Sequence, residues 1–319
     1  MAWQGKAGDT RNRVAELNVR SLARSFAASL QQYDCRYGAM LTLPSDNVIG
    51  KSLRIYGEWA EHELSVLRSF ISPGVTVVDV GANIGTHTLP FSRWVGNGRV
   101  MAIEGQPAIS EILRLNCRQN GCSNVDVVNA ICSAKRGHVE FRSDYTSDEN
   151  FGGISFADAR SSTRRAVCRW LDRLRGSTVA SIPVITLDNL CRGLTVSFIK
   201  LDIEGMELDA LRGGRALITR CHPVIFFEQN NTARLSETYD YLTGVGYQMF
   251  WLETQPFNRN NFRGEDDNIW WRTETGILAL PAHISPPPGL IPVKGDEVTV
   301  PVRQNARDGV AIANTAFLQ

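Results

Sequence analysis

The sequence predicts an α/β fold with a doubly wound, mostly parallel sheet that ends in a C-terminal antiparallel hairpin. Short runs of branched apolar residues alternate with helical patterns, which is typical of parallel strands buried on both faces. A glycine loop joins one such run to a helix at residues 77–93, "VVDVGANIGTHTLPFSR". Two late apolar runs, "YQMFWL" and "GILALP", are suited to the terminal hairpin.

The pattern can be followed element by element. In "WAEHELSVLRSFI" (59–71), the apolar residues Ala60, Leu64, Leu67 and Ile71 share one helical face, and "SPG" ends the helix. Further expected elements are strands at 76–80, 99–105, 125–131, 196–205 and 223–230, and a helix at 107–121 that Gly121 stops. The alternation breaks at 143–181, which we interpret as an insertion or flap region.

Composition narrows the class of partner. The 319 residues include 34 Lys+Arg and 33 Asp+Glu, with 43% hydrophobic and 21% charged residues. This balance is ordinary for a globular protein and lacks the basic bias of a nucleic-acid or membrane binder. We therefore expect neither nucleic acid nor membrane as a partner; oligomeric state is left open.

Seven scattered cysteines form no CxxC motif, which argues against a disulfide framework and a structural zinc site. The sequence also shows no apolar run of membrane-spanning length and no signal-peptide core. These features predict a cytoplasmic protein without a bound metal.

The glycine loop does not fit a nicotinamide or flavin dinucleotide. That fingerprint, G-x-G-x-x-G, would start at Gly81 and require glycine where Asn83 and Thr86 stand. An acid at Asp79, inside the strand end, would also repel a pyrophosphate. It suits a ligand with a cationic amino-acid end.

A second acid indicates the other part of the ligand. Glu104 follows Gly85 by 19 residues and ends the next strand, where a carboxylate can accept hydrogen bonds from both hydroxyls of a ribose. A ribose beside an amino-acid moiety describes S-adenosylmethionine; the alternative is a tight turn with no ligand. The expected cofactor-binding residues are Asp79, Gly81, Ala82, Asn83, Gly85 and Glu104.

At this point the chain resembles a known family. "VVDVGANIGTHTLPFSR", "ITLDNL", "FIKLDIEGMELDALRGG" and "PVIFFE" are similar to the FkbM-type methyltransferases. The resemblance implies a class I, Rossmann-like, S-adenosylmethionine-dependent fold and methyl transfer to small-molecule hydroxyls, with amide nitrogen as the acceptor of some members. The resemblance covers roughly residues 45–282. We expect a methyltransferase domain at 49–282, an N-terminal helical extension at 1–48 and a proline-rich tail at 283–319.

Candidates for the chemistry lie at strand ends, where doubly wound folds bind ligands. Asp202 and Glu204 end the fourth strand and can act as a base, or they organise the turn and cap the next helix. Lys200 shares a strand face with Asp202, which favours a buried ion pair. His87 can be a general base or merely line a helix start.

The acceptor is expected to be a small-molecule, glycosyl or peptide group. "ENFGGISF" (149–156) can be a flap over the cofactor or a tight turn, and "NNFRGEDDNIWW" (260–271) can be an acceptor lid or an ordinary long hairpin loop. Six arginines at 160–175 can recognise an anion or face solvent. Glu58 and Glu63 either reach the donor's amino end or are solvated. Glu228 and Asn230 can bind acceptor hydroxyls, and no ligand spacing supports a metal with them.

O-methylation of a small-molecule or glycosyl hydroxyl is the favoured function, with amide N-methylation of a peptide next. A binding protein that keeps the cofactor pocket without catalysis is an alternative of another class. A nucleic-acid methyltransferase is disfavoured because the Asn/Asp-Pro-Pro-Tyr/Phe tetrapeptide is absent from the fourth strand.

Overall fold

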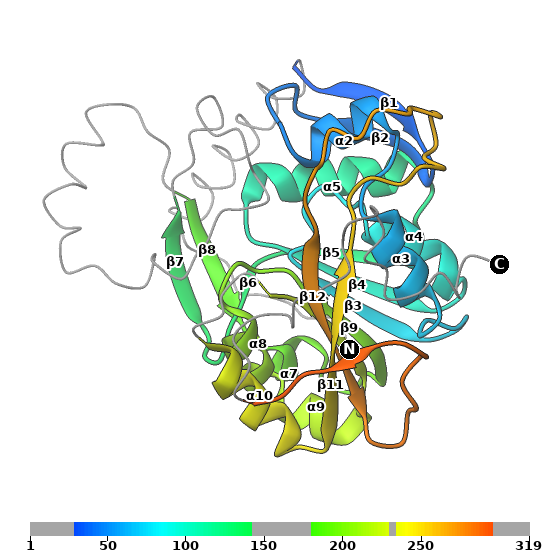
Figure 1. Ribbon diagram of the computed structural model, residues 1–319. Helices are drawn as coiled ribbons and strands as arrows, with labels where there is room; N and C mark the ends of the chain where they lie inside the picture. The colour runs from blue at the N-terminus through cyan, green and yellow to red at the C-terminus, as the bar shows by residue number, and fades with distance from the viewer. Residues whose placement is uncertain (1–28, 142–179, 230–233, 296–319) are drawn as a thin grey trace, which may run out of the picture.

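The computed structural model describes residues 29–141, 180–229 and 234–295, and Figure 1 shows a central sheet with helices on both faces. The sheet has eight strands in the order β13-β11-β12-β10-β9-β3-β4-β5. Strands β10, β9, β3, β4 and β5 are mutually parallel, while β12, β11 and β13 pair antiparallel to their neighbours. The expected doubly wound sheet with its C-terminal antiparallel hairpin is confirmed.

The strands of the main sheet are β3 (Thr76–Val80), β4 (Arg99–Glu104), β5 (Val125–Asn129), β9 (Val196–Leu201), β10 (Val224–Glu228), β11 (Tyr247–Thr254), β12 (Glu274–Pro281) and β13 (Ile291–Pro292). Two smaller sheets contain β1 (Gln31–Cys35) with β2 (Gly38–Thr42), and β6 (Ile131–Cys132), β8 (Ala180–Ile185) and β7 (Gly137–Phe141).

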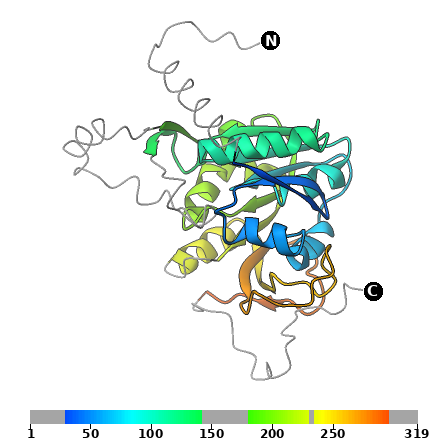
Figure 2. The same ribbon diagram turned by 90° about the horizontal axis from the view of Figure 1, so that it is seen from above.

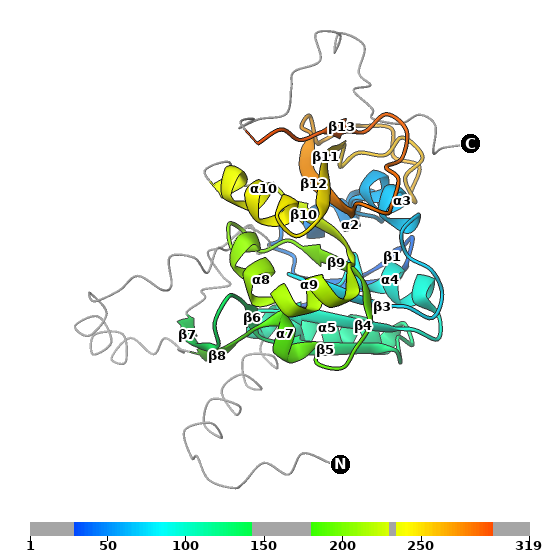
Figure 3. The ribbon, with the colours of Figure 1, turned by 90° about the horizontal axis from the view of Figure 1, so that it is seen from below.

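The described helices are α2 (Ile49–Ile55), α3 (Glu61–Arg68), α4 (Thr88–Val95), α5 (Pro107–Gln119), α7 (Leu187–Leu190), α8 (Glu207–Gly213), α9 (Arg215–Cys221) and α10 (Leu235–Thr243). Seen from above and below, α3, α4, α5 and the β1–β2 hairpin cover one face of the sheet, and α7 to α10 cover the other (Figures 2 and 3). Burial of apolar side chains between these layers stabilises the fold.

The core divides by face. On the α7–α10 side, the inward residues of the strands, such as Ile199 and Ile225, pack with Leu211 and Ile218. On the other side, α3 and α4 pack through Leu64, Leu67 and Phe91 against Val77 and Phe198. Because the central strands are covered on both faces, they consist of nearly continuous apolar residues, which is why their positions are visible in the sequence.

Two end segments differ from expectation. The N-terminal extension was expected to be helical, but residues 31–42 form the β1–β2 hairpin, paired from Gln31 with Thr42 to Cys35 with Gly38. The weak helical periodicity of the sequence before this hairpin does not continue into residues 31–42. At the other end, the proline-rich tail adds a strand: β13 pairs with β11 through Ile291 and Pro292. Residues 1–28 and 296–319 lie outside the described residues.

In the part of the chain that the structure describes, no helix combines the length and apolar character needed to cross a bilayer.

A backbone hydrogen bond joins the carboxyl end of β3 to the turn after β9. Asp202 N donates to Val80 O at 3.0 Å. Next to this bond Gly81 has φ +76°, and a Cβ placed on it would lie 1.8 Å from the Asp202 carbonyl oxygen. Glycine is therefore required here both for its left-handed backbone and for the close approach of two strand ends.

We predict that Gly81→Ala costs about 3 kcal/mol or more of unfolding free energy, because overpacking adds to the cost of the left-handed conformation. Gly121→Ala is a matched control: its φ is +67°, and a Cβ there meets nothing within 4 Å. The control should lose only about 1 kcal/mol in the same urea titration. Equal losses in both variants would show that the contact with Asp202 has no cost.

Candidate active site

The glycine loop lies across the end of β4. The backbone N–H groups of Gly81 and Ala82 both donate to Ile103 O, at 2.9 and 3.0 Å. The Asn83 N–H donates to Glu104 Oε2 at 3.0 Å, and Asn83 Oδ1 accepts from Ile84 N at 2.7 Å. These bonds hold the loop against the strand that carries Glu104, so the two expected cofactor motifs are neighbours in space.

Gly85 has a packing role. Its φ is +102°, and a Cβ there would lie 2.8 Å from Leu113 Cδ1 of α5 and 3.1 Å from Leu89 Cδ1 of α4. Asn83 also has a positive φ, of 49°, a conformation that asparagine tolerates better than most residues. The loop thus turns sharply while α4 and α5 close on it.

Glu104 is buried, and its two carboxylate oxygens each accept a backbone hydrogen bond: Oε2 from Asn83, and Oε1 from Gln106 at 2.7 Å. Burial raises the pKa of this carboxyl to about 7, although the two amide hydrogen bonds lower it. Each oxygen has a second lone pair, so the ionised carboxylate can still accept two hydroxyl hydrogen bonds.

Asp79 lies behind the loop. Its Oδ2 accepts from Thr88 Oγ1 at 2.6 Å, and its Oδ1 lies 3.9 Å from Lys200 Nζ. Within the described residues Oδ1 is buried without a hydrogen-bond partner. Asp79 therefore orients the start of α4 and balances Lys200; its contact with a donor ammonium stays a prediction.

Lys200 joins β3 to the candidate catalytic turn. Its ammonium is buried and donates to Asp202 Oδ2 at 3.0 Å, which confirms the expected ion pair. Burial lowers the pKa of Lys200, but the Asp202 and Asp79 carboxylates outweigh it and raise the pKa above its ordinary value. The Asp202 side chain is 27% exposed, so it combines a buried partner with an accessible carboxylate.

His87 is held by an acid from another helix. Its Nε2 lies 2.8 Å from Glu63 Oε1, and both side chains are buried. Glu63 comes from α3, 24 residues earlier, and its charge also acts on Lys200. Glu63 is thus neither solvated nor isolated. It connects His87 to the Asp79–Lys200–Asp202 group.

Glu204 occupies a strained turn. Its φ is +42°, in the left-handed region, where a non-glycine residue is uncommon. The Gly205 N–H donates to Glu207 Oε1 at 2.9 Å, and the N-cap position of α8, Met206, has no side-chain cap hydrogen bond. Glu204 remains a candidate for the chemistry.

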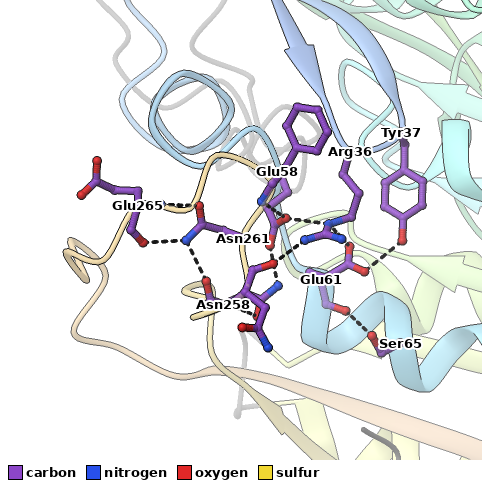
Figure 4. Close-up of polar contacts among 10 residues, drawn as sticks. Arg36, Tyr37, Glu58, Glu61, Ser65, Asn258, Asn261 and Glu265 are labelled. Carbon is purple, nitrogen blue, oxygen red and sulfur yellow. Dashed lines mark hydrogen bonds and ion pairs between the residues drawn. The ribbon is translucent and has the colours of Figure 1, made fainter. Parts of the chain in front are cut away.

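The connection between β11 and β12, residues 255–273, is named the strap. Glu58 fixes it: this buried carboxylate accepts from Arg36 Nε at 2.7 Å, from Asn258 Nδ2 at 2.8 Å and from the Phe262 N–H at 2.8 Å. Figure 4 shows Glu58 between Arg36 of the hairpin and Asn258 of the strap. Glu58 thus positions the strap.

A second anchor lies further along the strap. Tyr56 OH donates to Asp267 O at 2.7 Å and accepts from Ile269 N at 2.8 Å. Trp270 Nε1 donates to Ser52 Oγ at 2.6 Å. The segment expected as a lid is therefore bonded to α2 and to the loop after it, and it forms a fixed wall.

The C-terminal end of the strap lies near the candidate catalytic residues. Arg272 Nη2 lies 2.7 Å from Glu274 Oε1 at the start of β12, and its guanidinium stacks over Trp270. Burial raises the pKa of Glu274, Arg272 lowers it, and the charges of Glu63 and Asp202 raise it further. The sequence did not single out Glu274 or Arg272, because only the hairpin register brings them to this edge.

Other expectations lie outside the described residues: the flap at 149–156, the six arginines and Asn230. Glu228 ends β10 and adds its charge to the field at Lys200. In the described ranges no group of three or more His, Cys, Asp or Glu side chains is arranged to hold a metal ion.

Comparison with known proteins identifies the family. The Methyltransferase FkbM domain matches residues 79–249, more than half of the chain. The chain therefore belongs to the FkbM methyltransferase family. It is an S-adenosylmethionine-dependent methyltransferase with the class I, Rossmann-like fold.

Solved structures give distant similarities. FkbM methyltransferase from Methylobacillus flagellatus KT is 18% identical, with 84% of this chain and 59% of that chain covered and a TM-score of 0.40. Precorrin-6y C5,15-methyltransferase from Geobacter metallireducens GS-15 is 15% identical, with 69% and 86% covered and a TM-score of 0.41. Comparison with curated protein sequences gives no match.

The residues present fit the donor. Glu104 offers free lone pairs beside the loop, and Asp79 offers a buried oxygen that lacks a hydrogen bond among the described residues. These acids match the ribose hydroxyls and the ammonium of S-adenosylmethionine. When bound, the donor supplies an electrophilic methyl group on a sulfonium.

We predict that donor affinity rises with pH through neutrality. Glu104 accepts ribose hydroxyls as a carboxylate, and its pKa of about 7 in the free protein leaves roughly one tenth ionised at pH 6 and nine tenths at pH 8. Calorimetry with S-adenosylhomocysteine should therefore show about tenfold tighter binding at pH 8.

The Glu104→Gln variant is the control for this pH effect. It should bind more weakly and lose the contribution of this carboxyl to the pH dependence, while any effect of the ligand's own amino group stays in both proteins. An identical pH dependence in the variant and the parent would contradict the assignment of Glu104.

Proposed function

We propose that this methyltransferase transfers the methyl group to a hydroxyl of a small-molecule or glycosyl acceptor. The observation that carries the proposal is the gathering of proton-accepting side chains beside the donor loop: Asp202 paired with Lys200, and His87 paired with Glu63. An alcohol must lose its proton during methyl transfer, so a positioned base accelerates the reaction.

His87 has the arrangement of a base with an orienting acid. With Nε2–H donated to Glu63, the imidazole keeps Nδ1 as its proton acceptor. The carboxylate fixes this tautomer and stabilises the imidazolium that forms when the proton arrives, as in other acid–histidine pairs.

Asp202 has a different role in this proposal. Its carboxylate is held by the Lys200 ammonium and stays accessible, so it can accept a hydrogen bond from the substrate hydroxyl. We infer that Asp202 orients the hydroxyl and His87 takes the proton. Glu204, on the adjacent turn, adds negative charge near the acceptor.

We predict that His87→Ala lowers turnover by about 10²–10⁴, the usual contribution of a general base, with donor affinity nearly unchanged. Asp202→Asn should also lower turnover, and Glu204→Gln less so. The assay uses methyl-labelled donor with pools of glycosides, polyols and peptides, and mass spectrometry or NMR locates the methyl group. Calorimetry measures donor binding separately.

Glu237→Gln is the matched control, since this exposed carboxylate pairs only with Arg212 among the ion pairs of the described residues. It should keep full turnover. If all three site variants also keep full turnover, the assigned residues are wrong. A methyl group found on peptide nitrogen would replace the hydroxyl proposal by amide methylation, and one on carbon or sulfur would reject the reaction class.

A further inference from the structure

Helix α5 ends in a Schellman motif whose two contacting positions are cysteines. The Cys122 N–H donates to Cys117 O at 2.9 Å, and the Gly121 N–H donates to Arg118 O at 3.1 Å. Gly121 has φ +67°, the left-handed conformation that ends such a helix. This motif folds the residue after the glycine back over the last turn and brings its side chain against that of Cys117.

The Cys122 sulfur lies 4.0 Å from Asn120 O, and Cys117 is the neighbouring thiol that shifts its pKa. The pKa of Cys122 lies below its ordinary value, chiefly because its thiolate accepts the Cys117 hydrogen bond. Burial opposes this shift, while Ser92 and Arg93 assist it. The same hydrogen bond and burial raise the pKa of Cys117. Cys122 is half-buried and Cys117 is buried, so the more acidic thiol is also the more accessible one.

We propose that Cys122 and Cys117 form a peroxide-reactive pair, in which Cys122 is the nucleophile and Cys117 the resolving thiol. The backbone bonds of the Schellman motif already place these two side chains against each other, so ring closure needs no large backbone movement. The pair is independent of the methyl-transfer residues and of the identity of the acceptor.

The chemistry balances with hydrogen peroxide as the oxidant. The Cys122 thiolate attacks one peroxide oxygen; an S–O bond forms, the O–O bond breaks, and hydroxide leaves as water after taking a proton. Cys117 then loses its proton and attacks the Cys122 sulfur. An S–S bond forms, the S–O bond breaks, and a second water leaves. Two thiols are oxidised, and one peroxide is reduced to two waters.

The location gives the pair a structural context. Asn116, next to Cys117, donates from Nδ2 to Ile84 O of the donor loop at 2.8 Å and accepts from the Leu41 N–H at 2.7 Å. Other described cysteines lack this arrangement: burial raises the pKa of Cys35, Cys132 and Cys191. Half-buried Cys221 has its thiol 3.7 Å from Leu194 O.

The test uses the full chain, reduced and then treated with dilute hydrogen peroxide. Trypsin cuts after Arg118, so the disulfide would join peptides 115–118 and 119–135 under non-reducing conditions. We expect this linked pair, about 2 Da lighter than the sum of the reduced peptides and reversible by dithiothreitol. Fragment ions distinguish Cys122 from Cys132 within the longer peptide. N-ethylmaleimide should label Cys122 about tenfold faster than Cys221 at neutral pH.

Variants assign the roles. In Cys117→Ser, the link should vanish and Cys122 should proceed to sulfinic acid, because no resolving thiol remains. In Cys122→Ser, Cys117 should stay reduced. Cys221→Ser is the matched control and should keep the link, and near-ultraviolet circular dichroism checks that all variants fold. Absence of the linked peptides in the parent protein, or equal labelling of Cys122 and Cys221, would overturn the proposal.

Discussion

The ammonium of Lys200 is the charge around which the active-site edge is organised. It lies in the middle of the sheet, where β9 pairs with β3 so that Lys200 is directly opposite Asp79. A buried ammonium without partners costs several kcal/mol, so the carboxylates of Asp79 and Asp202 must stay beside it. Their positions in turn fix Thr88 at the start of α4 and the turn that follows β9.

The need to neutralise Lys200 explains why Asp79, Asp202 and Glu63 have different roles. Asp79 is fully buried and serves the interior, whereas Asp202 bonds the same ammonium but keeps an accessible carboxylate. Glu63 adds negative charge from the helical side and binds His87. The Lys200 ammonium thus lies in the field of four acids, Asp202, Asp79, Glu63 and Glu228.

The sequence predicted what local periodicity determines. The buried strands, the C-terminal β11–β12 hairpin and the Lys200–Asp202 pair all follow from a repeat of two residues and from continuous apolar runs. It could not assign Glu58 or Glu63. Glu58 meets Asn258, which is 200 residues away, and no local pattern encodes that contact. The helical prediction for residues 31–42 is wrong for a related reason. The β1–β2 hairpin forms because its strands pair with each other and pack on α5, and these contacts override a weak helical tendency.

The distribution of these contacts along the chain separates the glycine loop from the strap. The glycine loop, Glu104 and the Lys200 group all lie within the segment that matches the family. The Glu58 clamp does not: Arg36 and Glu58 precede that segment, and Asn258 and Phe262 follow it. Two flanking pieces of chain therefore meet at the carboxyl edge of the sheet and hold each other through one buried carboxylate. The strap carries Trp270 and Arg272 to the border of the Asp202 site. The shape of this border therefore depends on a contact outside the segment that matches the family. A change in the strap can then alter the shape of this border while the glycine loop keeps its own hydrogen bonds.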